Sequence, residues 1–399
     1  MGGNKTILQE HNERLAALVE TVTDLPDAGV GGSLPSANTR DVNFYDYNGT
    51  LLYSYTVAEA MALTQLPPLP SHDGLTCRGW NYTLTDIRSG ENRDIGAMYT
   101  TNDGKTRVYI TLYAGRTSPK LGCCPNGTVT VDWGDGTTPD VLTGTSVTVV
   151  QWTPNHEYAE PGDYVITLTV NGSMGFYGNS SANQYSGILR HSADADTRNA
   201  VYQSAVRCVQ IGAGITTISV CAFRHCVNLT SITIPDTVTG IADYVFADCG
   251  ALTYVTIPNG ITSMGTNLFN SCVALYTISI PNTVTTIGGY AFRYCDSLSH
   301  ISIPKSITSI STYMFNGCTS LARVIIPGKV TSISAYSFGG CAGVRFFDFS
   351  EHTTVPSMSS NGAFSGISED SEIRVPASLT EQWKTDTNWS KYADNIVGV

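Results

Sequence analysis

Charged residues are scarce in this sequence: only 14% of its 399 residues are Asp, Glu, Lys or Arg. The 33 acidic residues outnumber the 22 Lys and Arg, so the formal net charge is −11 at pH 7. Nucleic acids and anionic membrane surfaces bind clustered cations, and no basic run is present, so we expect neither as a partner. No stretch approaches the roughly 20 consecutive apolar residues of a membrane-spanning helix, so we expect no membrane insertion.

Signals for export, metal binding and catalysis are also missing. The N-terminal residues Met1–Lys5 lead into a polar stretch without the apolar core of a secretory signal, so we expect synthesis and folding in the cytoplasm. No Cys-x-x-Cys pair or His spacing typical of zinc sites is present. No acidic residue recurs in register to supply the paired carboxylates of a glycoside hydrolase. We therefore expect no metal, no cofactor and no enzymatic activity.

What the sequence does contain is a 23-residue repeat over residues 206–350. Cysteine, phenylalanine and proline each recur with this period. The positions are Cys226, Cys249, Cys272, Cys295, Cys318 and Cys341; Phe223, Phe246, Phe269, Phe292, Phe315 and Phe338; and Pro235, Pro258, Pro281, Pro304 and Pro327. Self-similarity at a fixed period of this length predicts a solenoid, in which stacked units bury a continuous core.

The repeat unit has a strand part and a turn part. In the unit from Leu275 to Cys295, the spacing Leu-x-x-Ile-x-Ile predicts a strand, which Pro281 ends because proline has no N–H to donate. The part Ala-Phe-x-x-Cys predicts a short helical turn. We interpret the repeat cysteines as small apolar core residues with free thiols, rather than as disulfides or metal ligands. After Cys341 the register drifts, and an insertion of three residues restores it at Ala363.

The chain as a whole is predicted to be multidomain and mainly β. Apolar residues spaced three and four apart near the N-terminus predict a helix, which either packs on its own chain or forms the short coiled coil of a homo-oligomer such as a trimer. The predicted segments are 1–26 (helix), 27–40 (linker), 41–92 (small hairpin and helix), 93–172 (β-sandwich), 173–205 (connection), 206–350 (repeats) and 351–399 (degenerate last repeat and C-terminal cap).

Within the segment 41–92, two local patterns predict structure. Alternating residues on both sides of Asn48-Gly49 predict a hairpin closed by a type I′ turn. Thr56 is expected to cap a short helix over Val57–Leu63, ended by the prolines that follow.

Residues 93–172 read as antiparallel strands separated by Asn, Gly and Pro turns. Three stretches, Val131–Thr137 (Val-Asp-Trp-Gly-Asp-Gly-Thr), His156–Tyr158 and Pro161–Tyr164, resemble the PKD-like, immunoglobulin-like domain. The resemblance implies a sandwich of about seven strands with Trp133 in its core.

Two groups of residues outside the repeats allow more than one interpretation. Asp132, Asp135 and Asp140 fit structural turns or ligands of a calcium ion, although the spacing of an EF-hand is absent. His156 beside Asp132 or Asp135 could be an acid–base pair, but the PKD-like resemblance implies a structural role. The redox state of three further thiols stays open: Cys77, Cys123 and Cys124.

The 23-residue unit resembles the BspA-type leucine-rich repeat at each diagnostic position, and Val375–Ala393 resembles the C-terminal cap of such arrays. Phe44–Thr50, Ser71–Leu75 and Gly79–Tyr82 resemble a segment of tail-fibre-like proteins of gut phages and prophages. These resemblances imply a rigid array that displays residues for binding.

A candidate binding face follows from the strand alternation within the repeats. One outward position varies in size, charge and aromaticity from repeat to repeat, as expected of residues that contact a ligand. These residues are Tyr254, Thr277, His300, Arg323 and Phe346. The alternative is that they are only tolerated surface residues.

The sequence therefore predicts a non-enzymatic binding or structural protein. We expect a phage or prophage tail-fibre or receptor-binding component, located in the virion tail, which recognises a glycan or protein on the host cell surface and joins other fibre subunits through its N-terminal region. The alternative is an adhesin on a bacterial cell surface. The ligand and the oligomeric state are not determined by the sequence.

Overall fold

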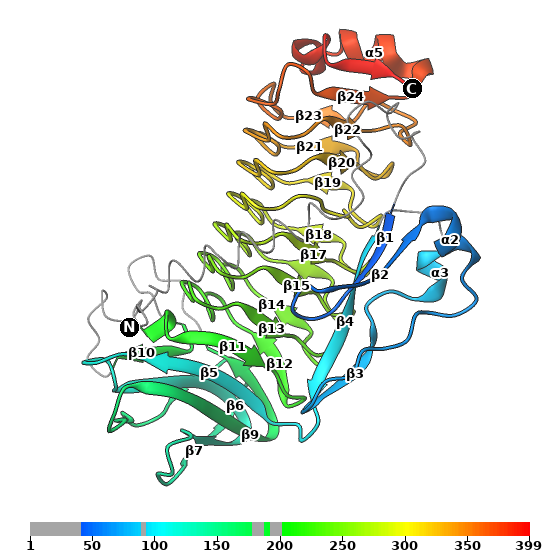
Figure 1. The fold of residues 1–399 in the computed structure, drawn as a ribbon. Coiled ribbons are helices and arrows are strands. Elements are labelled where there is room, and N and C mark those ends of the chain that lie inside the picture. The colour runs from blue at the N-terminus through cyan, green and yellow to red at the C-terminus, as the bar shows by residue number, and fades with distance from the viewer. Residues whose placement is uncertain (1–40, 89–92, 178–186, 192–201) are drawn as a thin grey trace, which may run out of the picture. The chain divides into compact units, whose positions relative to one another are not determined.

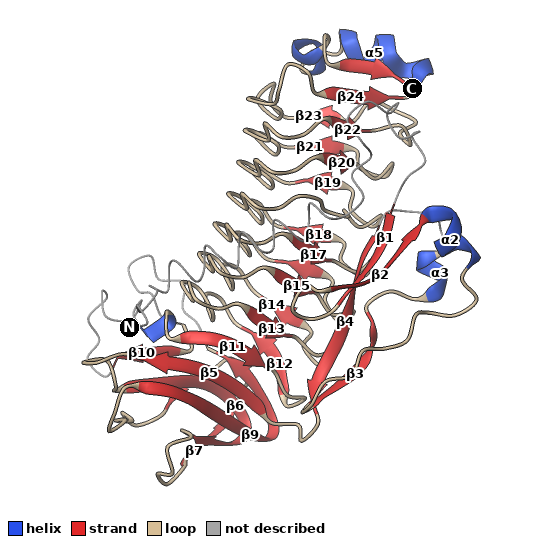
Figure 2. Cartoon of the chain, in the orientation of Figure 1, coloured by secondary structure: helices blue, strands red, loops and turns tan. Residues whose placement is uncertain are grey.

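The structure is a computed structural model that describes residues 41–88, 93–177, 187–191 and 202–399. The helix predicted over 1–26, the linker over 27–40 and the coiled coil lie outside the described residues. The described part consists mainly of strands, with a few short helices (Figure 2). The predicted fold class, a mainly β chain whose C-terminal part is a solenoid, is confirmed.

The first group of elements is a four-stranded sheet, which we call the small sheet, with strand order β2-β1-β4-β3 (Figure 1). The predicted hairpin is present, and Thr56 forms a capping box with Glu59 at the start of its helix. Phe44 and Trp80 meet edge to face in its core, with 4.9 Å between ring centroids. The elements are β1 (Asp41–Tyr45), β2 (Leu51–Thr56), α2 (Val57–Ala62), β3 (Leu75–Trp80), α3 (Leu84–Ile87) and β4 (Arg93–Thr101).

The boundary predicted between residues 92 and 93 falls inside the small sheet. Strand β4 pairs in parallel with β1 and antiparallel with β3. Its side chains Ile95 and Tyr99 are buried in the same core as Phe44. The sequence pattern of β4 is that of any half-buried strand, so it does not show which sheet the strand joins.

The turn between β1 and β2 is not the predicted type I′ turn. That turn needs positive φ at both central residues, whereas in this hairpin Gly49 has φ 86° and Asn48 is not in the left-handed region. The Asn48 carboxamide oxygen accepts a hydrogen bond from Thr50 N at 3.0 Å. This side-chain bond stabilises a longer loop, which is closed by Asp46 N donating to Thr50 O.

The second group is a ten-stranded sheet that continues into the repeats. Its central strand β6 pairs with β9 along one edge and with β7, β8 and β10 along the other. The strands are β5 (Thr106–Leu112), β6 (Pro119–Asp132), β7 (Asp140–Thr145), β8 (Gln151–Trp152), β9 (Gly162–Phe176), β10 (Leu189–His191), β11 (Val206–Gln210), β12 (Ile215–Ile218), β13 (Ser231–Thr233) and β14 (Gly240–Ile241).

The ten-stranded sheet and the repeats share one hydrophobic core. Strand β9 runs past the boundary predicted at residue 172, because Met174 and Phe176 alternate with small residues and are fully buried. It then pairs in parallel with β12, the first strand of the second column of repeat strands. The predicted connection over 173–205 therefore begins later than expected.

The repeats stack with parallel strands in register, one above the next (Figure 1). Tyr254 pairs with Thr277, 23 residues on, and Phe346 pairs with Glu372, 26 residues on, which confirms the predicted three-residue insertion. The further strands are β15 (Tyr254–Thr256), β16 (Ser263–Met264), β17 (Thr277–Ser279), β18 (Thr286–Ile287), β19 (Ser309–Ile310), β20 (Arg323–Ile325), β21 (Ser332–Ile333), β22 (Phe346–Asp348), β23 (Ser357–Met358), β24 (Glu372–Val375) and β25 (Ile396–Gly398).

A column of phenylalanine rings runs through the repeat core. Phe269 and Phe292 are 5.7 Å apart between centroids, and Phe292 and Phe315 are 5.4 Å apart, with nearly parallel planes. Each repeat cysteine lies beside this column, and Cys295 Sγ donates to the carbonyl oxygen of Phe269 at 3.2 Å. The predicted role of these cysteines as core residues agrees with their complete burial.

The long turn of each repeat is not the short helix predicted from Ala-Phe-x-x-Cys. Two residues in each of six successive turns have positive φ, for example Tyr290 (60°) and Tyr294 (57°). Left-handed residues cannot continue a right-handed helix. Their N–H groups instead donate to the next repeat, Tyr290 to Thr312 O and Tyr294 to Asn316 O.

The last described elements close the open end of the array. Trp383 and Trp389 are fully buried against the last repeat, and β25 pairs in parallel with β24 as a final rung. The helices are η1 (Ala377–Leu379), α5 (Thr380–Thr385) and η2 (Trp389–Tyr392). This arrangement agrees with the cap expected over 375–393.

Candidate functional surfaces of the repeats

The predicted binding face is partly covered by the chain itself. Tyr254 and Thr277 are each only 1% exposed. Strand β4 of the small sheet packs across β13, β15 and β17 (Figure 1). At Gly96 the two layers approach so closely that an added methyl group would lie 2.6 Å from the Tyr254 hydroxyl oxygen. The prediction of one open ladder of five residues is therefore wrong for Tyr254 and Thr277.

His300, the next residue of the predicted face, also contacts the small sheet. Its Nε2 atom lies 2.9 Å from Asp94 Oδ1, and the Asp94 side chain is only 2% exposed. The Tyr45 hydroxyl lies 3.4 Å from the same nitrogen. Burial is the main cause that raises the pKa of Tyr45, and the nearby Asp94 charge adds to it. His300 thus serves the attachment of the small sheet.

Buried polar groups complete this attachment. The Asn81 carboxamide donates to Ile257 O at 3.1 Å and accepts from Gly96 N at 2.8 Å and from Ser279 Oγ at 3.0 Å. The Tyr82 hydroxyl donates to Ile280 O. Because both hydrogen-bonding ends of a buried carboxamide are satisfied, the small sheet has one specific position on the repeats.

Three residues of the predicted face remain partly exposed, namely His300 and the two residues at its C-terminal end. Arg323 and Phe346 are half-buried. The Arg374 guanidinium lies over the Phe346 ring at 4.0 Å, and its Nε atom donates to Glu372 at 2.7 Å. Arg323 and Phe346 therefore stay candidates for contact with a partner.

A different exposed feature, which sequence reasoning missed, lies on the long turns. Tyr290, Tyr313 and Tyr336 form the tyrosine column: their rings stack at 4.9 and 5.0 Å between centroids. Tyr336 is 41% exposed and the neighbouring Tyr294 is 42% exposed. The signal was present in the sequence, since tyrosine precedes Ala-Phe in the repeat consensus, but the expected helical turn hid its orientation.

The backbone at these tyrosines makes them unusual. Each turn has two positions with positive φ, where glycine or asparagine costs least. In the later repeats the second position is occupied by Gly317 and Gly340, as expected because glycine is favoured at positive φ. The first position stays tyrosine in the same repeats, at Tyr313 and Tyr336. The tyrosine side chains therefore have a role that the backbone does not explain.

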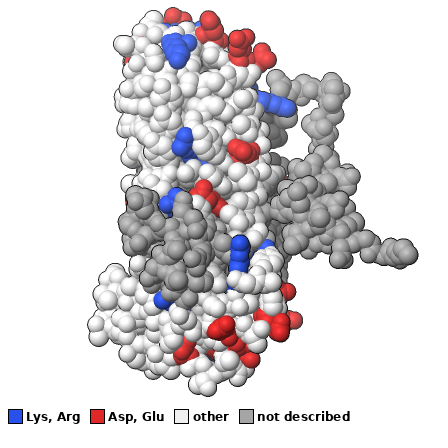
Figure 3. All heavy atoms as spheres, turned by 90° about the vertical axis from the view of Figure 1, so that its left-hand side faces the viewer, with Lys and Arg blue, Asp and Glu red and all other residues white. Residues whose placement is uncertain are grey.

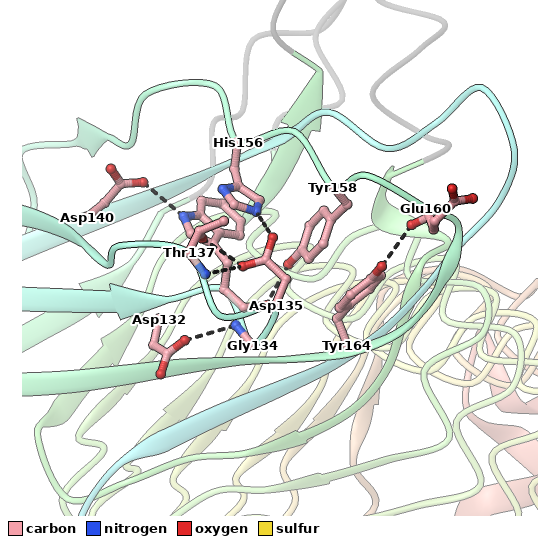
Figure 4. Close-up of polar contacts among 10 residues, drawn as sticks. Asp132, Gly134, Asp135, Thr137, Asp140, His156, Tyr158, Glu160 and Tyr164 are labelled. Carbon is pink, nitrogen blue, oxygen red and sulfur yellow. Dashed lines mark hydrogen bonds and ion pairs between the residues drawn. The ribbon is translucent and has the colours of Figure 1, made fainter.

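The aspartates considered as calcium ligands stabilise their own turn (Figure 4). Asp132 Oδ1 accepts from Gly134 N at 2.9 Å, and Asp135 Oδ1 accepts from Thr137 N at 3.1 Å. Asp140 accepts from the indole N–H of Trp133 at 2.9 Å. Within the described part of the chain, no group of three His, Cys, Asp or Glu side chains is placed to hold a metal ion.

His156 joins the same turn through Asp135. Its Nε2 atom lies 2.8 Å from Asp135 Oδ2, and its ring stacks on Trp133 at 4.5 Å (Figure 4). Burial would raise the pKa of Asp135, but hydrogen bonds from Thr137 and His156 outweigh it and lower the pKa. The Tyr158 hydroxyl donates to Trp133 O. The geometry is that of a structural corner around a buried tryptophan.

All eleven cysteines lie within the described residues and are free thiols. Burial raises the pKa of Cys124 to about 11 and that of Cys341 to about 12. Burial also raises the pKa of Cys77 and Cys123. A thiol that stays protonated at neutral pH is a poor nucleophile, so none of these four is activated for chemistry.

Among the described residues, no helix is both long and apolar enough to span a bilayer.

Comparison with known protein families matches residues 197–321 and 286–382 to the BspA type leucine rich repeat region, in six copies. The match falls on the predicted repeats and confirms that resemblance. No curated protein matches the sequence. The PKD-like and tail-fibre resemblances find no support in these matches and stay predictions.

Several crystal structures of bacterial proteins are similar to the chain. A leucine rich cell surface protein from Faecalibacterium prausnitzii is 22% identical over 47% of this chain and 62% of its own, with a TM-score of 0.32. A leucine-rich repeat protein from Eubacterium ventriosum is 28% identical over 40% of this chain and 42% of its own, with a TM-score of 0.35. The leucine rich repeat protein of T. pallidum is 26% identical over 35% of this chain and 65% of its own, with a TM-score of 0.30. This chain thus spans less than two thirds of each.

Proposed function

We propose that this chain is a non-enzymatic binding protein of the bacterial cell-surface adhesin class, which holds its partner on the outer surface of the repeats. The tyrosine column carries this proposal. Tyrosine offers a large contact area, a hydroxyl group and few rotatable bonds, which is why it is enriched where proteins bind. In this chain three such rings are stacked and partly exposed on consecutive repeats.

The repeat core suits this role because it fixes the surface residues in place. The phenylalanine column and the inter-repeat hydrogen bonds hold each long turn against the next. Side chains displayed at fixed steps lose little conformational freedom when a partner binds, so more of the contact energy appears as affinity. The match to BspA-type leucine-rich repeats supports the same class of function.

The phage or prophage tail-fibre role takes second place, because it rests only on the sequence resemblance of residues 44–82. It differs from the adhesin role in location, a virion tail rather than a bacterial surface, and not in the way a ligand would be held. Arg323 and Phe346 offer a further contact area for either role.

Binding of fluorescently labelled full-length protein to a panel of bacterial and animal cells, measured by flow cytometry, tests the proposal. The variant Tyr313→Ser/Tyr336→Ser removes two rings of the column. Tyr113→Ser is the matched control, since Tyr113 is 41% exposed and lies outside the repeats. We expect wild type and the control to bind a subset of the cells, and the double variant to bind at least about fivefold less. Binding to no cell type, or equal binding by the double variant, would overturn the proposal.

A further inference from the structure

Arg293 lies on the same long turn as the half-buried Tyr290 and the exposed Tyr294, and its guanidinium is surrounded by aromatic rings. The distances from its central carbon to the ring centroids are 4.3 Å for Tyr294, 5.6 Å for Tyr290 and 5.6 Å for Tyr313. Guanidinium groups lie favourably against aromatic faces, and such contacts fix the orientation of the flat group. The side chain is half-buried, so the charge is held at the surface and not in the core.

The guanidinium of Arg293 has hydrogen-bonding capacity to spare. It donates from Nη2 to the Tyr294 hydroxyl at 2.7 Å and, more weakly, from Nε to Asn316 Oδ1 at 3.4 Å. An arginine side chain has five N–H groups. No carboxylate of the described residues lies within ion-pair distance of Arg293.

Arg224 shows the contrast, because it occupies the same repeat position three units earlier. It also lies over a ring, that of Tyr244, at 5.2 Å. Its Nε atom, however, lies 3.5 Å from the Asp248 carboxylate. The repeat can therefore supply an acidic partner for an arginine at this position. For Arg293, the described part of the chain supplies no such partner.

The surroundings of Arg293 are hydroxyl-rich and carry little charge. The side of the molecule with the long turns, on the left in Figure 1, has isolated charged residues on a mostly uncharged surface (Figure 3). The site thus offers one cation and three tyrosine rings with their hydroxyl groups. A polyanion such as DNA or heparin would need several cations in a row.

We propose that Arg293 binds the carboxylate of an acidic saccharide, that is, a mostly neutral glycan with one carboxylate-bearing sugar such as a sialic or uronic acid. One fixed cation matches one carboxylate, and guanidinium and carboxylate pair with two parallel hydrogen bonds. The tyrosine hydroxyls would bond the sugar hydroxyls, and the Asn316 carboxamide, whose Nδ2 donates to Gly339 O at 2.8 Å, helps to hold the guanidinium in place. An acidic protein is less favoured because the chain carries 33 Asp and Glu against 22 Lys and Arg. This inference rests on the proposed function and names its ligand.

The test measures binding of 3′-sialyllactose and of lactose to the full-length protein by isothermal titration calorimetry, with glucuronic acid-terminated and sulfated saccharides as further probes. We expect wild type to bind 3′-sialyllactose or the glucuronic acid probe at least about tenfold more tightly than lactose, as a charge-assisted pair contributes. Arg293→Ala should remove this difference, Arg293→Lys should keep part of it, and Arg224→Ala should leave it unchanged.

Two results would overturn the inference. One is equal binding of the acidic probes by wild type and Arg293→Ala, with both proteins unfolding at the same temperature. The other is binding of cells by the wild-type protein that acidic saccharides do not compete, or that acidic peptides compete instead; the proposed function would then stand without this ligand. If the protein binds neither cells nor saccharides, both proposals fail.

Discussion

The attachment of the small sheet to the repeats predicts a large effect of replacing one buried carboxamide. Asn81 is 1% exposed, and its side chain takes part in three hydrogen bonds, with Ile257 O, Gly96 N and Ser279 Oγ. Asn81→Ala removes all three. It leaves a carbonyl oxygen and an N–H group buried without their partners, at a place where the close packing of β4 leaves little room for water.

The expected loss follows from these contacts. A neutral hydrogen bond contributes about 1 kcal/mol net, and a buried polar group left unsatisfied costs about 1–3 kcal/mol. The three lost bonds alone predict a loss of about 3 kcal/mol in the free energy of unfolding, roughly a 150-fold change in the equilibrium constant, and the two orphaned groups add to this loss.

Urea denaturation followed by tryptophan fluorescence measures this loss, because Trp80 lies in the core of the small sheet. Asn43→Ala is the matched control: its carboxamide makes one exposed hydrogen bond, with Ser54 at 2.7 Å. The control should lose less than about 1 kcal/mol. If Asn81→Ala loses no more than Asn43→Ala, the buried carboxamide does not fasten the small sheet, and the reasoning is refuted.

Three further predictions concern the repeats. Phe292→Ala removes a fully buried ring from the phenylalanine column and should lower the free energy of unfolding by about 3–5 kcal/mol in urea denaturation. The control Val273→Ala, at an exposed residue, should lower it by less than about 0.5 kcal/mol. Equal losses would contradict the stabilising role of the phenylalanine column. Burial lowers the pKa of His352, and a hydrogen bond with the carbonyl oxygen of Val330 offsets this only in part, so the unfolded chain binds the proton more tightly. The contribution of His352 to stability should be complete above about pH 6.5 and fall as the pH drops below it. Burial also lowers the pKa of His225, which adds a slope of the same sign, so His352→Gln should reduce the slope in thermal unfolding without abolishing it, and an unchanged slope would refute the prediction. The six repeat thiols should not react with a thiol reagent in the native protein even at about pH 9, since burial raises their pKa, and fast labelling without unfolding would contradict their burial.

Much of the repeat architecture could be predicted because its residues recur in sequence. The Phe, Cys and Pro periods gave the register directly, and the drift after Cys341 located the three-residue insertion that pairs Phe346 with Glu372. The hairpin and the Thr56 cap were also predictable, since their patterns are local. In each case the residues that decide the structure lie close together or repeat at a fixed period.

The surfaces were predicted less well because they depend on contacts between distant segments. Strand alternation correctly predicts that Tyr254 points outward from the repeats. Its ring is nevertheless covered by β4, which lies more than 150 residues earlier in the chain. The repeat pattern does not predict that Asn81 or Asp94 lies next to this face of the repeats. The tyrosine column was missed because positive φ at Tyr290 and Tyr313 cannot be read from the residue type.

The central claim is that the small sheet covers one face of the repeats and leaves the tyrosine column open. Tyrosine nitration of the native protein, mapped by mass spectrometry, tests this most directly. Tyr294 and Tyr336, 42% and 41% exposed, should be nitrated readily. Tyr254 and Tyr45, 1% and 5% exposed, should react only after unfolding in urea. Nitration of Tyr254 in the native protein as fast as that of Tyr336 would contradict the account.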